Sequence, residues 1–148
     1  MDRTVIMLVE DNPDDEELSV RALRRHHLAN KLVVARDGQE ALDLLLGDGG
    51  LADRGELPQL VLLDLKLPKV SGLDVLRAIR NDTRTHVLPV VILTSSNEDM
   101  DLADGYELGA NSYVHKPVDF DTFSEAVRQL GLYWLVINYP PPHAVPAA

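Results

Sequence analysis

Four runs of unbroken apolar residues, and a weaker fifth, constrain the fold of this chain more than any other feature of its sequence. In chain order the runs are TVIMLVE, KLVVAR, LVLLDL, LPVVILTSS and NSYVHKP. They are short, rich in β-branched residues and not alternating, which is typical of strands buried on both faces of a parallel sheet. The sequence therefore predicts a sheet of five parallel strands.

Segments of helical character separate these runs. We expect helices over residues 14–28, from 37 to near 47, over 71–81, over 97–108 and from 119 onward. Asp37 and Glu40 have the spacing of a capping box, and Gly109 would stop the fourth helix. Strands that alternate with helices predict right-handed crossovers, which place helices on both faces of the sheet in an α/β fold.

The composition narrows the class of protein. A chain of 148 residues with 45% hydrophobic and 26% charged residues fits one ordinary globular domain. The net charge of −10 argues against nucleic-acid binding, and no run has the character of a membrane span or a signal peptide. The lack of cysteine excludes disulfides, thiol catalysis and thiolate metal sites. We expect a soluble cytoplasmic protein.

Polar side chains stand at the carboxyl ends of four of the five runs. The first run delivers Glu10 and Asp11, the third Asp64, the fourth Thr94 and Ser95, and the fifth His115 and Lys116. Parallel strands end at one edge of their sheet, and ligands of such folds bind there. We therefore expect three carboxylates, a hydroxyl and an ammonium group to converge at that edge.

This set of residue types points to phosphoryl chemistry with a metal ion. Clustered carboxylates repel one another unless a cation lies among them, and oxygen ligands alone select a hard ion such as Mg²⁺. Asp64 is the candidate nucleophile, because carboxylates can form acyl phosphates. Lys116 would neutralise phosphoryl charge, and Thr94 would donate a hydrogen bond. Taken singly, each residue also fits a helix cap or a solvated turn.

With these motifs in place, the sequence resembles the receiver domain of two-component response regulators over residues 5–130. The matching motifs are the pair Glu10-Asp11, the segment DLKLPKVSG at 64–72, LTSS and YVHKP. The resemblance implies a flavodoxin-like, three-layer αβα fold with five helices and a five-stranded parallel sheet of order 2-1-3-4-5.

The same resemblance implies how the acidic residues act. Asp64 would accept a phosphoryl group from a histidine kinase. Asp11 and Asp64 would bind Mg²⁺ directly, together with the backbone carbonyl of Lys66, while Glu10 would act through water. The protein would catalyse only its own phosphorylation and dephosphorylation, and it would not otherwise be an enzyme.

The resemblance also implies how the signal leaves the site. Thr94 and Lys116 would hold the phosphoryl group, and inward movement of Thr94 would draw in Tyr113. That switch would alter the face made by the fourth helix, the fifth strand and the fifth helix, which would signal through protein contacts. The chain is most similar to stand-alone regulators paired with bacterial phytochromes, so the kinase would be a phytochrome-type photoreceptor.

The end of the chain carries two further expectations. We expect a receiver domain with an extended last helix over residues 1–137, followed by a Pro-rich tail at 138–148 and no output domain. Beyond Gly131, Tyr133, Trp134 and Ile137 add more apolar surface than a last helix normally buries. Such a patch favours an interface, so we expect a homodimer, with a monomer as the alternative.

Three other functions compete with this interpretation. A phosphatase with an aspartyl-phosphate intermediate would need an acid two residues beyond the nucleophile, where this chain has Lys66. A flavodoxin-like electron carrier would need a hydroxyl- and glycine-rich phosphate loop where this chain has EDNPDD. A receiver-like binding module that is never phosphorylated conflicts with the intact acidic set and stays open to a chemical test.

Overall fold

Five short strands and four helices make up most of the described part of the chain. The computed structural model describes residues 5–27, 31–65, 67–94, 109–110, 112–115 and 120–132. The strands are β1 (Val5–Val9), β2 (Lys31–Ala35), β3 (Leu60–Leu63), β4 (Val90–Thr94) and β5 (Ser112–His115). The helices are α1 (Pro13–Arg25), α2 (Gly38–Leu46), α3 (Gly72–Asn81) and α5 (Phe120–Leu132). The expected helix over 97–108 lies outside the described residues.

The strands form one parallel sheet in the order β2-β1-β3-β4-β5. β1 lies between β2 and β3, with Leu8 opposite both Val34 and Leu62. The flavodoxin-like sheet predicted from the sequence is thereby confirmed. Because every strand is parallel, the carboxyl ends of β1, β3, β4 and β5 lie at the same edge.

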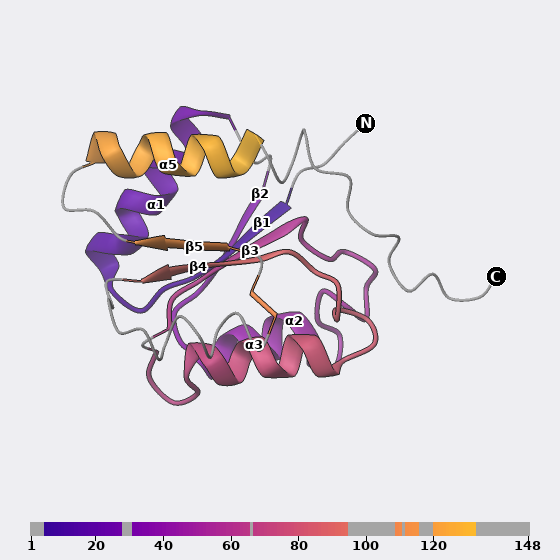
Figure 1. Cartoon of the computed structure of the whole chain (residues 1–148). Coiled ribbons are helices and arrows are strands. Elements are labelled where there is room, and N and C mark those ends of the chain that lie inside the picture. The colour runs from indigo at the N-terminus through magenta and orange to yellow at the C-terminus, as the bar shows by residue number, and fades with distance from the viewer. Residues whose placement is uncertain are drawn as a thin grey trace.

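Helices cover both faces of this sheet, with α1 and α5 on one side and α2 and α3 on the other (Figure 1). Alternate residues of each strand point to opposite faces. Ile6 and Leu8 pack in the cluster that includes Leu23 of α1, whereas Met7 and Val9 pack in the larger cluster with α2 and α3. Burial on both faces explains why the strands read as unbroken apolar runs.

Side-chain caps set the starts of the helices. Asn12 caps α1 by accepting hydrogen bonds from the backbone N–H groups of Asp14 (2.9 Å) and Asp15 (3.2 Å), and Pro13 takes the first helical position. The predicted end of this helix at residue 28 is wrong. The helix ends at Arg25, because His27 takes a left-handed φ of 52° that no α-helix continues through.

The capping box predicted at α2 forms in a shifted version. Asp37 accepts a hydrogen bond from the Glu40 backbone N–H (2.7 Å), as predicted. The Glu40 carboxylate accepts from the N–H of Arg36 (2.7 Å), one residue before the cap. α2 ends at Leu46, beside the expected stop at Gly47. Ser71, expected as the first residue of the third helix, is instead the residue that caps α3.

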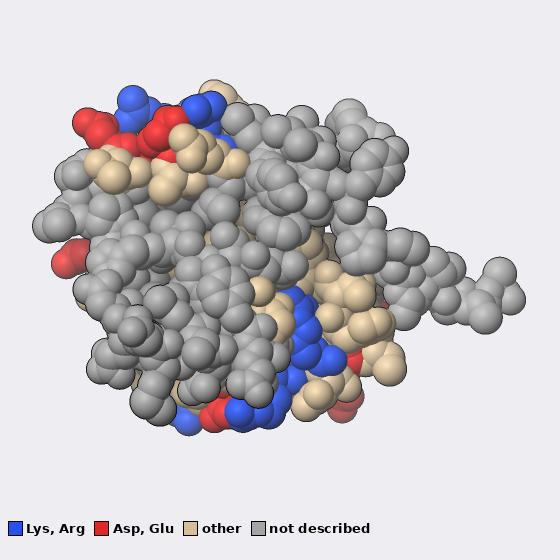
Figure 2. All heavy atoms as spheres, in the orientation of Figure 1, with Lys and Arg blue, Asp and Glu red and all other residues tan. Residues whose placement is uncertain are grey.

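Charged side chains of both signs lie together on the outer helices. Figure 2 shows acidic and basic side chains interspersed over α5. Within that helix Arg128 pairs with Glu125, three residues away, and Arg77 pairs with Asp74 at the same spacing in α3. Among the described residues, no helix is long and apolar enough to cross a membrane.

Candidate functional site

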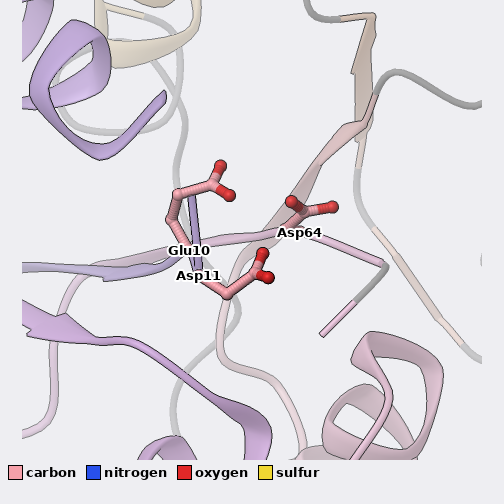
Figure 3. Close-up of side chains that lie close together, drawn as sticks. All are labelled: Glu10, Asp11 and Asp64. Carbon is pink, nitrogen blue, oxygen red and sulfur yellow. The ribbon is translucent and has the colours of Figure 1, made fainter. Parts of the chain in front are cut away.

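Three carboxylates meet at the carboxyl edge of the sheet. Glu10 and Asp11 follow β1, and Asp64 follows β3, the neighbouring strand. One ligand oxygen from each residue lies within 4.8 Å of the other two, and Figure 3 shows the three side chains together. The convergence predicted from the sequence is therefore confirmed for these residues.

The backbone fixes two of these carboxylates firmly. The N–H of Asp64 donates to the carbonyl of Val9 (3.0 Å), and the N–H of Glu10 donates to the carbonyl of Ala35 (2.9 Å). These bonds extend the sheet ladder one residue beyond the strands, so each carboxylate leaves a rigid strand end. Glu10 is 1% exposed and Asp64 is 7% exposed, whereas Asp11 is exposed. The cluster is thus buried at its base and open to solvent at Asp11.

The start of α1 adds a favourable field to the cluster. Asn12, the cap of α1, follows Asp11 directly, and its backbone N–H donates to the Glu10 carboxylate (3.3 Å). The N-terminus of a helix carries partial positive charge, which favours anionic groups nearby. The partial positive charge at the start of α1 therefore stabilises the carboxylates of Glu10 and Asp11, and it would stabilise an anion that binds beside them.

The donor set fits a hard divalent cation. Carboxylate oxygens alone, without imidazole or thiolate, suit Mg²⁺ or Mn²⁺ and not the softer transition metals. A divalent cation would also offset the mutual repulsion of carboxylates held this close. The one exposed member, Asp11, leaves room for the waters that Mg²⁺ keeps.

The loop from β3 to α3 turns back tightly behind Asp64. The N–H of Gly72 donates to the carbonyl of Leu65 (2.9 Å). A Cβ at Gly72 would overlap the carbonyl oxygen of Asp64 and would lie 2.6 Å from the Cα of Leu65. Only glycine permits this approach, which gives a physical reason for Gly72 in the motif DLKLPKVSG. Lys66, predicted to offer its carbonyl to the metal, lies outside the described residues.

Of the remaining predicted site residues, the structure describes only some. Thr94 is the last residue of β4 and pairs with His115 of β5, and Tyr113 pairs with Ile92. Thr94 is therefore placed at the carboxyl edge of the strand beside β3. The other predicted site and interface residues lie outside the described part of the chain: Ser95, Lys116, Tyr133, Trp134 and Ile137.

Sequence reasoning missed a contact between α2 and the loop behind Asp64. Lys69 of that loop lies with its Nζ 3.3 Å from an Oδ of Asp37. The hydrogen bond from the Glu40 N–H lowers the pKa of Asp37, and Lys69 lowers it further. The signal in the sequence was Gly38, since a helix start does not itself need glycine, and a glycine there indicates close backbone approach.

A parallel αβα fold with an acidic cluster at its carboxyl edge is typical of the receiver class of signalling domains. Residues 6–128 match the response regulator receiver domain family, and the chain belongs to that family. It is thus a signalling module of two-component systems. Family membership sets aside the phosphatase and electron-carrier alternatives.

Two curated relatives match nearly the whole chain. The probable methanogenesis regulatory protein FilR2 of Methanothrix harundinacea is 42% identical over 141 residues, which cover 95% of this chain and 89% of FilR2. The response regulator Rcp1 of Synechocystis is 34% identical over 131 residues, which cover 88% of each protein. Neither relative extends far beyond the matched region.

Solved structures narrow the similarity further. The phosphorylated cyanobacterial phytochrome response regulator RcpA has a TM-score of 0.86 and 34% identity, covering 95% of this chain and 99% of RcpA. The Mn²⁺-bound form of Rcp1 has a TM-score of 0.82 and 33% identity, with 93% and 99% covered. The bacteriophytochrome response regulator RtBRR has a TM-score of 0.74 and 49% identity, with 96% and 86% covered. The predicted resemblance to phytochrome-associated regulators is confirmed.

Proposed function

We propose that Asp64 is the phosphoacceptor of a two-component phosphorelay. The observation that carries this proposal is the convergence of Glu10, Asp11 and Asp64 at the carboxyl edge of the sheet. In the transfer, a carboxylate oxygen of Asp64 forms a bond to phosphorus as the bond between phosphorus and the histidine nitrogen of the kinase breaks. The imidazole nitrogen keeps that electron pair, and Asp64 becomes an aspartyl phosphate.

The metal in this proposal is Mg²⁺. Asp11 and Asp64 hold it directly with the backbone carbonyl of Lys66, and Glu10 acts through a water. When bound, the ion offsets the charge of the carboxylates and of the phosphoryl oxygens. The oxygen-only donor set supports this assignment. The Mn²⁺-bound structure of the relative Rcp1 supports it independently.

Two further residues complete the proposed site: Thr94, the last residue of β4, and Lys116, which follows β5 in the sequence. Thr94 donates a hydrogen bond to a phosphoryl oxygen, and Lys116 supplies a positive charge. Movement of Thr94 toward the phosphoryl group draws Tyr113 inward and reshapes the face of the fourth helix, β5 and α5. The end position of Thr94 on β4, and its pairing with β5, support this route.

The proposed partners are proteins. A histidine kinase supplies the phosphoryl group, and the likeness to RcpA and RtBRR supports a phytochrome-type kinase. We place this regulator in the cytoplasm, and its net charge of −10 supports a function without nucleic-acid binding.

The proposed assembly is a homodimer, with Tyr133, Trp134 and Ile137 in its interface. In this arrangement residues 1–137 form the receiver with its extended last helix, and residues 138–148 form a Pro-rich tail. The support is the apolar and aromatic composition of the segment after Gly131.

Acetyl phosphate with Mg²⁺, read by intact mass, tests the central assignment. We expect the native chain to gain one phosphoryl group and Asp64→Asn to gain none. Asp74→Asn is the matched control, because Asp74 is an exposed aspartate on α3 that pairs with Arg77. Equal labelling of native chain and Asp64→Asn would contradict the assignment. A native chain that gains no mass would favour the unphosphorylated binding module.

A further inference from the structure

Gly38, the first residue of α2, is packed against the loop that follows Asp64. It is buried, and its N–H donates to the carbonyl of Pro68 (3.4 Å). A Cβ at this position would overlap the carbonyl oxygen of Val70, and it would lie 2.7 Å from the carbonyl carbon and 2.8 Å from the Cβ of Val70. The start of α2 is therefore seated directly on the backbone of the loop.

The residue before Gly38 holds the same loop through its side chain. One carboxylate oxygen of Asp37 caps α2 through the Glu40 N–H, and the other lies 3.3 Å from Nζ of Lys69. Lys69 has a φ of 67°, in the left-handed region that a non-glycine residue rarely adopts. Because Lys69 is mostly exposed, the ion pair itself contributes little stability. The backbone contact at Gly38 is the stronger of the two restraints.

The opposite end of the loop is held by α3. The Gly72 N–H donates to the carbonyl of Leu65, and Ser71 caps the helix. Leu65 is thus held by the start of α3, and Pro68, Lys69 and Val70 are held by the start of α2. Position 66, whose carbonyl is a metal ligand in the proposed function, lies between these residues in the chain.

We propose that Gly38 and Asp37 are positioning residues for the metal and phosphoryl site. They touch neither group; they act by fixing the loop between Asp64 and Ser71 against α2. This inference rests on the proposed function, because it concerns the loop that would complete the metal site. A glycine within a helix is less favourable than alanine, so Gly38 is explained by the loop and not by α2 itself.

Gly47 provides a matched control at the other end of the same helix. A Cβ there would lie 2.5 Å from the carbonyl oxygen of Asp43, so Gly47→Ala also forces a backbone carbonyl of α2 to move. Among the contacts that the structure gives for Gly47, none is with the loop behind Asp64. Both substitutions should lower the melting temperature of the metal-free protein.

Calorimetric titration with Mn²⁺ distinguishes an effect of Gly38 on the metal site from a general loss of protein stability. We expect Gly38→Ala to weaken Mn²⁺ binding at least tenfold and to slow labelling by acetyl phosphate, while Gly47→Ala stays within twofold of the native affinity. A folded Gly38→Ala protein with native Mn²⁺ affinity overturns the inference. A native chain that binds no Mn²⁺ overturns the proposed metal site instead.

Hydrogen exchange on the native chain tests the inference even where Gly38→Ala does not fold. Coupling between two sites is reciprocal, so Mg²⁺ bound at the carboxylates must in turn stabilise the seat of α2 on the loop. We expect saturating Mg²⁺ to slow exchange of the Gly38 amide at least threefold more than exchange of the Gly47 amide, which reports the general gain in stability. Equal slowing of the two amides, or no slowing at Gly38, overturns the inference.

Discussion

At the scale of single residues, backbone hydrogen bonds and buried neighbours fix the position of the Asp64 carboxylate. Asp64 is 7% exposed, yet it follows a strand whose four residues are all buried, and its N–H completes the ladder to Val9. A carboxylate in such surroundings has few conformations open to it. Little conformational entropy therefore remains to be lost when a ligand binds it.

Asp37 should make stability depend on acid pH. Its folded pKa lies below the ordinary value, chiefly because it accepts a hydrogen bond from the Glu40 N–H. A lowered folded pKa stabilises the protein above the unfolded pKa of about 3.9, and the gain is lost as pH falls through the folded value.

The isosteric substitution Asp37→Asn keeps the cap but removes this charge. We expect it to lower the melting temperature by about 1–3 °C at pH 7, the size typical of a charge at a helix N-terminus. The difference from the native chain should shrink as pH falls below about 4 and vanish below the folded pKa. Calorimetric melting curves over this range check it, and a difference that is constant with pH would contradict it.

At the scale of elements, Arg80 ties α3 to the start of two strands. Its guanidinium donates to the carbonyl of Gly109 from Nε (3.0 Å) and Nη2 (2.7 Å), and to the carbonyl of Leu88 from Nη1 (2.7 Å). Gly109 has a φ of 98°, and a Cβ there would lie 2.8 Å from Nε of Arg80. Burial lowers the pKa of Arg80, although the group stays charged. The residue fixes the ends of β4 and β5 that lie opposite the carboxylates.

Arg80→Met should therefore destabilise the protein strongly. The substitution keeps an unbranched apolar stem but leaves the carbonyls of Gly109 and Leu88 without these donors, at a cost of about 2–3 kcal/mol. Arg77→Met, one turn earlier on α3, removes an exposed pair with Asp74 and should cost less than about 1 kcal/mol. Urea unfolding of both variants measures the two costs, and similar midpoints would contradict the assigned role of Arg80.

Local patterns predicted the elements of this fold well, because burial on both faces leaves a plain mark on a strand. The unbroken apolar runs located the described strands, and Asp37 and Gly47 marked the two ends of α2. The predicted first helix is too long, because the residue types at 26–28 are compatible with a helix. The left-handed backbone of His27 cannot be read from its side chain.

Contacts between distant residues left no such mark. The carboxylate cluster could be predicted because parallel topology alone brings Glu10, Asp11 and Asp64 to one edge. The bond from Arg80 to Gly109 joins residues 29 apart, and the seat of Gly38 on Val70 depends on how two layers meet. Such contacts follow from tertiary packing, which no short pattern encodes.

At the scale of the whole molecule, bound metal should raise stability through linkage. A ligand that binds only the folded state at one hundred times its dissociation constant adds about 2.7 kcal/mol. We expect Mg²⁺ at that level to raise the melting temperature of the native chain by roughly 5–10 °C.

Asp11→Asn should remove this response, because it neutralises one of the proposed ligands. Asp43→Asn, on the exposed face of α2, should keep the full response. Thermal melts with and without Mg²⁺ make the comparison. An equal rise in Asp11→Asn and in the native chain would place the metal elsewhere.

The proposed homodimer is also a property of the whole chain. Light scattering should give twice the monomer mass for the full chain and the monomer mass for a form that ends at Leu132, which keeps α5 complete. The physical reason is the loss of the aromatic and apolar side chains after that residue. A monomer in both forms would contradict the prediction.

The last strand to be synthesised, β5, lies at an edge of the sheet. β5 is an edge strand that pairs only with β4, whereas β2, β1, β3 and β4 are adjacent in the sheet and are all synthesised by residue 94. During synthesis the central strand β3 therefore has both of its neighbours, and all three carboxylates are present, before β5 is made. The strand that would carry the switch is the last to be added, and it can loosen without opening the pairing of β1 with β3 on which the acidic cluster depends.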